Sequence, residues 1–326
     1  MTPQDEATIC NWHQSLNEEA ELTALLSIDP QSEVLRTFCE DFTRIAPRVG
    51  MRTSAAEADD MPGIQIHPRL VYNAVPQGPE LEPFLTGIKA FRSDDSETLS
   101  AGQPVTPATD LPASLKLFIA PQCPFCPTVV SQLLPLVKAG ENLSLAIIDS
   151  LLFPTQAQTQ TVQSVPTLLL DDHYRWTGSL PLQEVIHLIN NRDPAQLGAD
   201  SLRNLLQQGR AGQLAEMMIA HGSIFPALYE LLTHPKWPIR LGAMVVVETL
   251  CGQDPALAQQ VVVPLRKKFS RADNTTQGDI LHTIGQAGDL SVIPWLESIA
   301  PTSDNPEIKD AAREAVLAIR DRFAGI

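Results

Sequence analysis

The spacing of apolar and polar positions predicts a strand that leads directly into a helix within Ser114–Thr128, SLKLFIAPQCPFCPT. Leu115, Leu117 and Ile119 alternate with other residues, as in a buried strand, and Pro121 ends the run. The residues after Cys123 follow a helical pattern. The two cysteines of the CPFC sequence are therefore expected where a strand ends and a helix begins.

Further strands and helices are predicted after this stretch. They are a strand at Leu143–Ile148, a short helix or loop at Phe153–Gln163, strands at Thr167–Leu170 and His173–Thr177, and a helix at Leu182–Ile189. Asp171-Asp172 is expected to turn the third strand back into the fourth, and Gly178 to separate the last strand from the helix.

A similar order is predicted for residues 1 to 92. The expected elements are a helix within Thr8–Leu16, strands at Leu22–Ile28 and Val49–Thr53 with a helix from Val34 to Ile45 between them, a hairpin formed by Ile64–Ile66 and Leu70–Val75, and a helix at Leu81–Phe91. At the first strand-to-helix connection, Asp29-Pro30-Gln31-Ser32-Glu33 takes the place of a cysteine pair. We therefore expect this copy to be chemically silent.

The rest of the chain is polar and then helical. Residues 93 to 112 are rich in Ser, Thr and Pro, which is typical of a connection. After Asp193-Pro194 the pattern is helical, and Arg240, Gln277 and Lys309 take equivalent offsets at intervals of 37 and 32 residues. The repeat resembles the short HEAT-like class, in which helix pairs stack and each buries its apolar face on the next.

Composition and charge limit the partners and the cellular compartment that we expect for this protein. The chain has 326 residues and a net charge of −15, which argues against nucleic acid and anionic membranes as partners. Met1–Cys10 lacks the pattern of a secretion signal, and no apolar run reaches membrane-spanning length. Three of the five cysteines are isolated, namely Cys10, Cys39 and Cys251, which suits a reducing compartment. We expect a cytoplasmic protein.

The CPFC sequence points to thiol chemistry. Unpaired N–H groups and the helix dipole at a helix start favour the thiolate, so Cys123 is expected to be the nucleophile. Cys126 lies one turn further and is placed to resolve a mixed disulfide formed on Cys123. A zinc half-site has the same spacing, but the chain has no second C-x-x-C and no H-x-x-x-H partner. We expect neither a metal nor a cofactor.

Residues Ser114 to Asn191 closely resemble the thioredoxin fold. The resemblance implies that Pro166 is a cis-proline facing the cysteines, with Val165 beside it. Pro124-Phe125 is similar to the Pro-Tyr of glutaredoxins, but Trp176-Thr177-Gly178 replaces the Gly-Gly that helps to hold glutathione, which argues against glutathione binding. Thioredoxins also carry a buried acid in the strand before the active site, where this sequence has only apolar residues facing the core.

The two copies together resemble the N-terminal module of the flavoprotein that reduces bacterial peroxiredoxins, and archaeal protein disulfide oxidoreductases. We expect a tandem thioredoxin-like α/β protein joined to an all-α HEAT-like solenoid. The expected domains are a degenerate thioredoxin-like domain at 1–92, a linker at 93–112, an active thioredoxin-like domain at 113–193, and HEAT-like repeats at 194–326.

The implied activity is thiol-disulfide exchange with a protein partner that the HEAT-like domain recruits. The expected catalytic residues are Cys123 and Cys126, and the expected substrate-binding residues are Pro124, Phe125, Val165 and Pro166. The alternative is a scaffold or chaperone-type binding protein whose C-x-x-C senses redox state without turning over.

Overall fold

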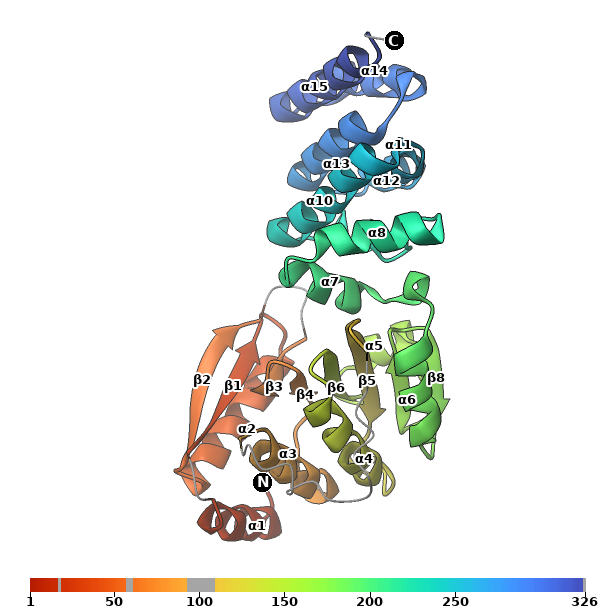
Figure 1. Ribbon diagram of the computed structural model, residues 1–326. Helices are drawn as coiled ribbons and strands as arrows, with labels where there is room; N and C mark the ends of the chain where they lie inside the picture. Colours follow the sequence, from red (N-terminus) through yellow and green to blue (C-terminus); the bar gives the residue numbers. More distant parts are fainter. Residues whose placement is uncertain (17–18, 57–60, 93–108, 325–326) are drawn as a thin grey trace. The chain divides into compact units, whose positions relative to one another are not determined.

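The computed structural model describes residues 1–16, 19–56, 61–92 and 109–324 (Figure 1). The chain forms two compact units, Met1–Arg192 and Asp193–Ile326. Most of the predicted linker at 93–112 lies outside the described residues, because residues 93–108 are not among them. None of the described helices is both long enough and apolar enough to cross a membrane.

The first unit is built from two halves that carry strands and helices in similar order. The first half (residues 1–92) contains α1 (Pro3–Gln14), β1 (Ala20–Leu26), α2 (Gln31–Ile45), β2 (Val49–Ala55), β3 (Gly63–His67), β4 (Leu70–Asn73), the 3-10 turn η1 (Gly78–Glu80) and α3 (Leu81–Arg92). The second half (residues 109–192) contains β5 (Ala113–Ile119), α4 (Cys126–Ala139), β6 (Leu143–Asp149), α5 (Pro154–Thr159), β7 (Thr167–Leu170), β8 (Tyr174–Thr177) and α6 (Leu182–Asn191).

One continuous sheet of eight strands crosses both halves, in the order β2-β1-β3-β4-β6-β5-β7-β8 (Figure 1). In each half two strands are parallel and two further strands are added antiparallel: β2-β1 is followed by β3 and β4, and β6-β5 by β7 and β8. The halves join where β4 pairs in parallel with β6. Strand β5, which precedes the cysteine pair, is interior to the sheet, and this explains why six of its seven residues are buried.

Two predicted boundaries in the first half were wrong. The first helix begins at Pro3 and not near Thr8, because Thr2 and Asp5 form a capping box in which the Thr2 hydroxyl accepts from the Asp5 N–H at 3.1 Å. The first strand spans Ala20–Leu26 and does not reach Ile28. The backbone N–H of Ser27 donates to the Ser32 hydroxyl at 2.9 Å, so it leaves the ladder.

Two basic side chains form hydrogen bonds from one half of the first unit to the other. The guanidinium of Arg69, in the β3–β4 turn, donates to the carbonyls of Val137 and Gly140 near the end of α4. In return, the Lys138 ammonium on α4 donates to the Ala90 carbonyl near the end of α3 at 2.5 Å. Cations at helix C-termini satisfy carbonyls that have no partner within the helix. Each half thus completes a helix of the other.

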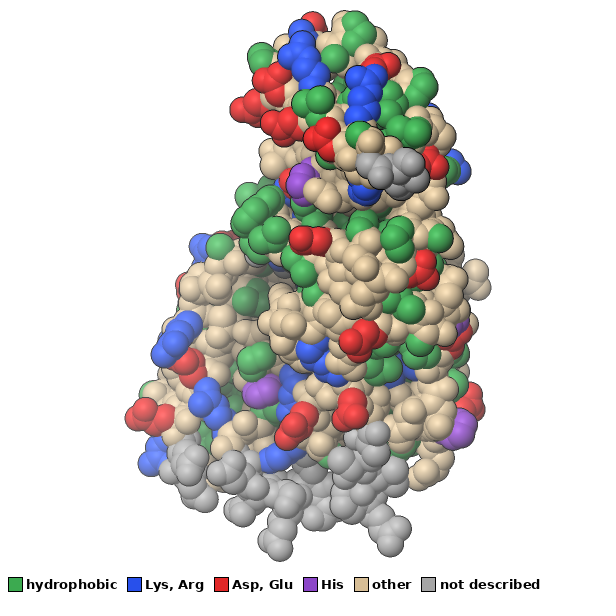
Figure 2. Space-filling view, turned by 45° about the horizontal axis from the view of Figure 1, so that its top comes forward, with side chains coloured by type: hydrophobic (Ala, Val, Ile, Leu, Met, Phe, Trp, Pro, Cys, Tyr) green, Lys and Arg blue, Asp and Glu red, His purple; other side chains and the backbone are tan. Residues whose placement is uncertain are grey.

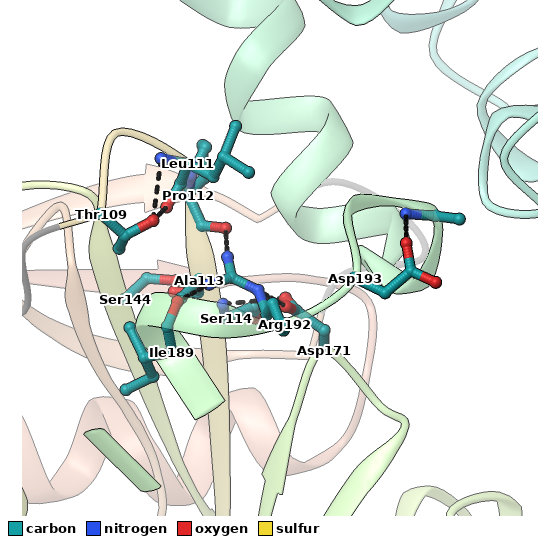
Figure 3. Close-up of polar contacts among 11 residues, drawn as sticks. Thr109, Leu111, Pro112, Ala113, Ser114, Ser144, Asp171, Ile189, Arg192 and Asp193 are labelled. Carbon is teal, nitrogen blue, oxygen red and sulfur yellow. Dashed lines mark hydrogen bonds and ion pairs between the residues drawn. The ribbon is translucent and has the colours of Figure 1, made fainter. Parts of the chain in front are cut away.

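A buried ion pair between Asp171 and Arg192 links separate segments of the second half (Figure 3). The Asp171 carboxylate lies 2.7 Å from Arg192 Nε, and both side chains are at most 1% exposed. Asp171 also accepts from the Ser114 N–H at 3.2 Å, and Arg192 donates to the carbonyls of Pro112 and Ile189. The pair therefore holds the start of β5, the β7–β8 turn and the end of α6 together.

The second unit consists of helices and 3-10 turns throughout its described residues. They are η3 (Pro194–Gln196), α7 (Ala199–Gln207), α8 (Ala211–His221), α9 (Leu228–Leu231), α10 (Trp237–Gln253), α11 (Pro255–Ala258), η4 (Gln259–Val261), α12 (Val262–Phe269), α13 (Asn274–Ala287), η5 (Leu290–Val292), α14 (Ile293–Thr302) and α15 (Pro306–Phe323).

The predicted repeat positions fall at equivalent places in three of these helices. Arg240, Gln277 and Lys309 are each the fourth residue of α10, α13 and α15. These helices pack in sequence, α10 on α13 and α13 on α15. At the second contact, a Cβ on Gly285 would lie 2.9 Å from the Ala315 Cα, so the close approach needs glycine.

Candidate active site

The cysteine pair lies where β5 connects to α4, as the sequence predicts. The Cys123 N–H donates to the Ala120 carbonyl at 3.0 Å, which tightens the turn just before the helix. Cys126 is the first residue of α4 and is fully buried, whereas Cys123 is half-buried. Both are free thiols. Another molecule can therefore reach the Cys123 sulfur, whereas the Cys126 sulfur is accessible only to groups inside the protein.

The buried thiol is held in its protonated form. Burial raises the pKa of Cys126 far above its ordinary value, and its hydrogen bond with Cys123 raises the pKa further. The negative charge of the Glu80 carboxylate acts in the same direction. Cys126 therefore needs a proton acceptor nearby before it can act as a nucleophile.

The Val165-Pro166 peptide bond is cis, which confirms the prediction. Pro166 is buried and directly precedes β7, while Val165 is half-buried. The Val165 carbonyl oxygen lies 3.8 Å from Cys123 Sγ. The structure thus brings together the half-buried sulfur and a backbone carbonyl.

The two residues between the cysteines point outward. Pro124 is exposed, and Phe125 is 70% exposed despite its large apolar ring. All six site residues predicted from the sequence therefore cluster around one sulfur atom, and Phe125 offers an apolar surface beside it.

A buried carboxyl group from the first half acts electrostatically on the Cys126 thiol and was missed by sequence reasoning. Glu80, the last residue of η1, is 3% exposed, and neither of its oxygens has a hydrogen-bond partner among the described residues. Burial raises the pKa of Glu80 to about 7, with a smaller contribution from the Asp149 carboxylate. A carboxyl group that titrates near neutrality can accept and return a proton at physiological pH.

Asp149 has a different role in the same region. It ends β6, and its carboxylate accepts from the N–H groups of Leu151 at 2.8 Å and Leu152 at 3.3 Å. Burial raises the pKa of Asp149, while these two hydrogen bonds oppose the increase. Asp149 therefore stabilises the turn after β6 and adds negative charge near Glu80.

No sequence signal identified Glu80, because an acid just before the start of a predicted helix is ordinary. On β5 the sequence predicts core-facing apolar residues at Leu115, Leu117 and Ile119. All three are buried, as expected. The buried carboxyl group that acts on Cys126 lies in η1 of the first half and not in β5. Among the described residues, no three His, Cys, Asp or Glu side chains converge in a way that could hold a metal ion.

Residues 114–190 match the family model of the thioredoxin domain. This stretch is a thioredoxin-like domain. It contains Cys123, Cys126 and Pro166, whereas Glu80 lies outside it. No curated protein sequence matches the chain.

Three solved structures are similar to the chain in fold. The N-terminal domain of alkylhydroperoxide reductase AhpF from Enterococcus faecalis is 19% identical, with 58% of this chain and 99% of that chain covered and a TM-score of 0.48. A protein disulfide oxidoreductase from Aeropyrum pernix is 16% identical, with 60% and 95% covered and a TM-score of 0.49. Sso1120 from Sulfolobus solfataricus is 18% identical, with 53% and 99% covered and a TM-score of 0.37.

Proposed function

We propose that this protein is a thiol-disulfide oxidoreductase that exchanges disulfides with a protein partner through Cys123 and Cys126. The observation that carries the proposal is the contrast between the two thiols. Cys123 is half-buried just before α4, and Cys126 is buried behind it. A redox sensor needs only a pair that oxidises, but an exchange catalyst needs one accessible sulfur and one shielded sulfur.

The exchange proceeds in two balanced steps. The Cys123 thiolate attacks a disulfide sulfur of the partner, which forms a mixed disulfide and releases the partner's first thiolate. Cys126 then attacks the Cys123 sulfur, which forms the Cys123–Cys126 disulfide and releases the partner's second thiolate. The partner gains two electrons and the cysteine pair loses two. An external dithiol returns the pair to its reduced form, and the same steps run in reverse oxidise a partner.

Glu80 takes the proton in the second step. The Cys126 thiol is a poor nucleophile until it loses its proton, because its pKa is raised by burial. The Glu80 carboxylate, whose pKa burial raises to about 7, receives that proton and returns it when the pair is reduced again. Its lack of other hydrogen-bond partners among the described residues leaves its oxygens available for this transfer.

The backbone at Val165 holds the partner in an extended form. Its carbonyl lies 3.8 Å from Cys123 Sγ, so a backbone N–H of the bound segment can pair with it as in a strand. The exposed ring of Phe125 contacts the apolar side chains of the same segment.

The fold of the first half fits a second, degenerate thioredoxin fold. It repeats the strand order and the parallel and antiparallel pairs of the second half, with Asp29-Pro30 in place of the cysteines. We extend the proposal to a HEAT-like arrangement of the second unit, which rests on the matching positions of Arg240, Gln277 and Lys309.

The helical unit recruits the protein partner. Trp237, Leu241 and Val245 follow one another at four-residue spacing on α10, and they are 53%, 39% and 40% exposed. Leu241 and Val245 also line a groove of about 190 Å³ between α10 and α13. Hydrophobic side chains remain exposed on this unit among acidic and basic ones (Figure 2). A docking surface of this kind raises the local concentration of one partner near the cysteines.

The test of catalysis is the reduction of insulin by dithiothreitol. The wild-type protein should accelerate insulin precipitation, Cys123→Ser should abolish the acceleration, and Cys10→Ser should retain it, since Cys10 is exposed on α1. Wild-type protein that forms the Cys123–Cys126 disulfide but gives no acceleration is a redox sensor, and the enzymatic proposal is then wrong.

The test of recruitment uses Cys126→Ser, which retains the attacking thiol and leaves mixed disulfides unresolved. In that background, Trp237→Ser with Leu241→Ser should redistribute the trapped proteins, with the dominant partner reduced relative to the rest. The matched control is Val263→Ser, which changes an exposed residue on α12 (57%). Identical trapped proportions in both variants would remove recruitment from the proposal.

A further inference from the structure

Among the described residues of the first unit, the large exposed apolar side chains lie at one edge of its sheet. Four large ones are exposed among the described residues of Met1–Arg192: Ile28 (91%), Val34 (45%), Phe125 (70%) and Leu151 (63%). Ile28 follows β1, Phe125 follows β5 and Leu151 follows β6, while Val34 lies in the first turn of α2. β1, β5 and β6 run parallel through the sheet, so all four side chains are at the edge where these strands end.

The strand register places these connections at one level. Paired residues cross the sheet from β1 to β5 in a continuous row: Thr23, Gln65, Val71, Ala146 and Lys116. Leu26 ends β1 three residues after Thr23, and Ile119 ends β5 three residues after Lys116. The loop that carries Ile28 and the loop that carries Cys123 therefore leave the sheet at the same level of one edge, with β3, β4 and β6 between them.

The spacing of the two loops suits an extended polypeptide. Four strand-to-strand steps separate β1 from β5, through β3, β4 and β6. At about 4.8 Å a step, the two strand ends are about 19 Å apart. An extended chain covers about 3.3 Å per residue, so about six residues span this distance. Leu151, at the neighbouring strand β6, lies between the two ends of the path.

We propose that the first half is a second anchoring site for the disulfide-bearing substrate, in which Ile28 and Val34 bind an apolar side chain about six residues from the cysteine that Cys123 attacks. The proposal rests on the proposed function. The occupant is the substrate's extended segment because the strand register places Ile28 at the same edge as Cys123, within reach of one extended segment. The Val165 carbonyl near Cys123 Sγ also fits strand-like binding.

In this proposal the first half binds substrate, although it has no cysteine pair at its first strand-to-helix connection. Asp29-Pro30 follows Ile28 where the second half has its reactive turn, and the Asp29 carboxylate is used locally, accepting from the Gln31 N–H at 2.8 Å. The loop is thereby fixed while Ile28 stays almost fully exposed. An exposed, rigidly presented apolar side chain loses little conformational entropy when it binds.

The test uses the reduced full-length protein carrying Cys10→Ser, which removes the exposed thiol on α1, and two synthetic peptides in a single turnover. Each peptide carries one cysteine linked by a disulfide to 5-thio-2-nitrobenzoate, so attack by Cys123 at the peptide sulfur releases the coloured thiolate. One peptide has Leu six residues from the cysteine and the other has Ser there. We expect the Leu peptide to react about tenfold faster at low concentration, as expected for burial of part of one Leu side chain.

A double variant assigns the effect to the proposed site. Ile28→Ser with Val34→Ser should no longer distinguish the two peptides, whereas Val263→Ser on α12 should retain the full preference. Discrimination that persists in the double variant, or equal rates of the two peptides with wild-type protein, would overturn the anchoring proposal alone. If neither peptide releases the coloured thiolate, the thiol-disulfide function itself is wrong.

Discussion

Glu80 and Cys126 come from different halves of the first unit, yet they form one buried site. Both side chains are at most 3% exposed, and after burial and the Cys123 contact the Glu80 charge is a further cause of the raised pKa of Cys126. The relationship depends on β4 pairing with β6, which brings the turn after β4 close to the strands of the active half. The half without the CPFC sequence therefore supplies a buried charge that acts on a thiol of the other half.

Glu80→Gln should slow the second exchange step and spare the first. Gln cannot accept the Cys126 proton, so resolution of the mixed disulfide should slow about a hundredfold at neutral pH, within the range of general base catalysis. Stopped-flow release of the partner's second thiol measures this step. In the wild-type protein the rate should rise with pH through about 7, where the carboxyl becomes a carboxylate. An unchanged pH profile in the variant would remove Glu80 from the mechanism.

The same substitution should make the protein more stable in mildly alkaline solution. The folded pKa of Glu80, about 7, is above its ordinary value, so the protonated carboxyl favours the folded state. That stability is complete below about pH 4.5 and is lost as the pH rises through about 7. Gln stays neutral, so the variant should gain roughly 1–3 kcal/mol at pH 8 relative to wild type and little at pH 4. Urea denaturation at the two pH values measures the difference.

Iodoacetamide at mildly acidic pH should label Cys123 before Cys126, Cys39 and Cys251. Cys123 is half-buried just before a helix start, so it is more accessible to the reagent than the buried thiols of Cys126 and Cys39. Burial raises the pKa of Cys39 to about 12 and also raises those of Cys126 and Cys251. Peptide mass spectrometry after brief labelling gives the order. Earlier labelling of any of these three thiols would mean that the nucleophile is misassigned.

Asp171→Asn should destabilise the protein strongly, because it leaves the buried Arg192 guanidinium without its ion-pair partner. Removing one partner of a buried pair costs roughly 3–5 kcal/mol. The control is Asp310→Asn, which breaks the exposed pair with Arg313 and should cost about 1 kcal/mol or less. Thermal or urea unfolding measures both. Equal losses in the two variants would show that the Asp171–Arg192 pair does not hold this part of the fold.

The pattern of neighbouring residues was sufficient to predict the helices and strands and the location of the cysteine pair. Alternation through Leu115, Leu117 and Ile119 identified β5, and the CPFC spacing alone placed Cys123 before a helix and Cys126 one turn on. Errors were confined to boundaries such as Pro3, where a capping interaction between Thr2 and Asp5 extends a helix beyond its apolar pattern. These features depend on residues that are neighbours in the chain, so their spacing is enough to predict them.

Tertiary structure alone decided which distant residues share a site. Glu80 lies 46 positions before Cys126, and no periodicity connects an acid in one half with a thiol in the other. The alignment of Ile28 with the Cys123 loop follows from five strands in register. Sheet pairing brings together backbones that the sequence keeps far apart. The buried acid and the apolar edge therefore exist only once the two halves share one sheet.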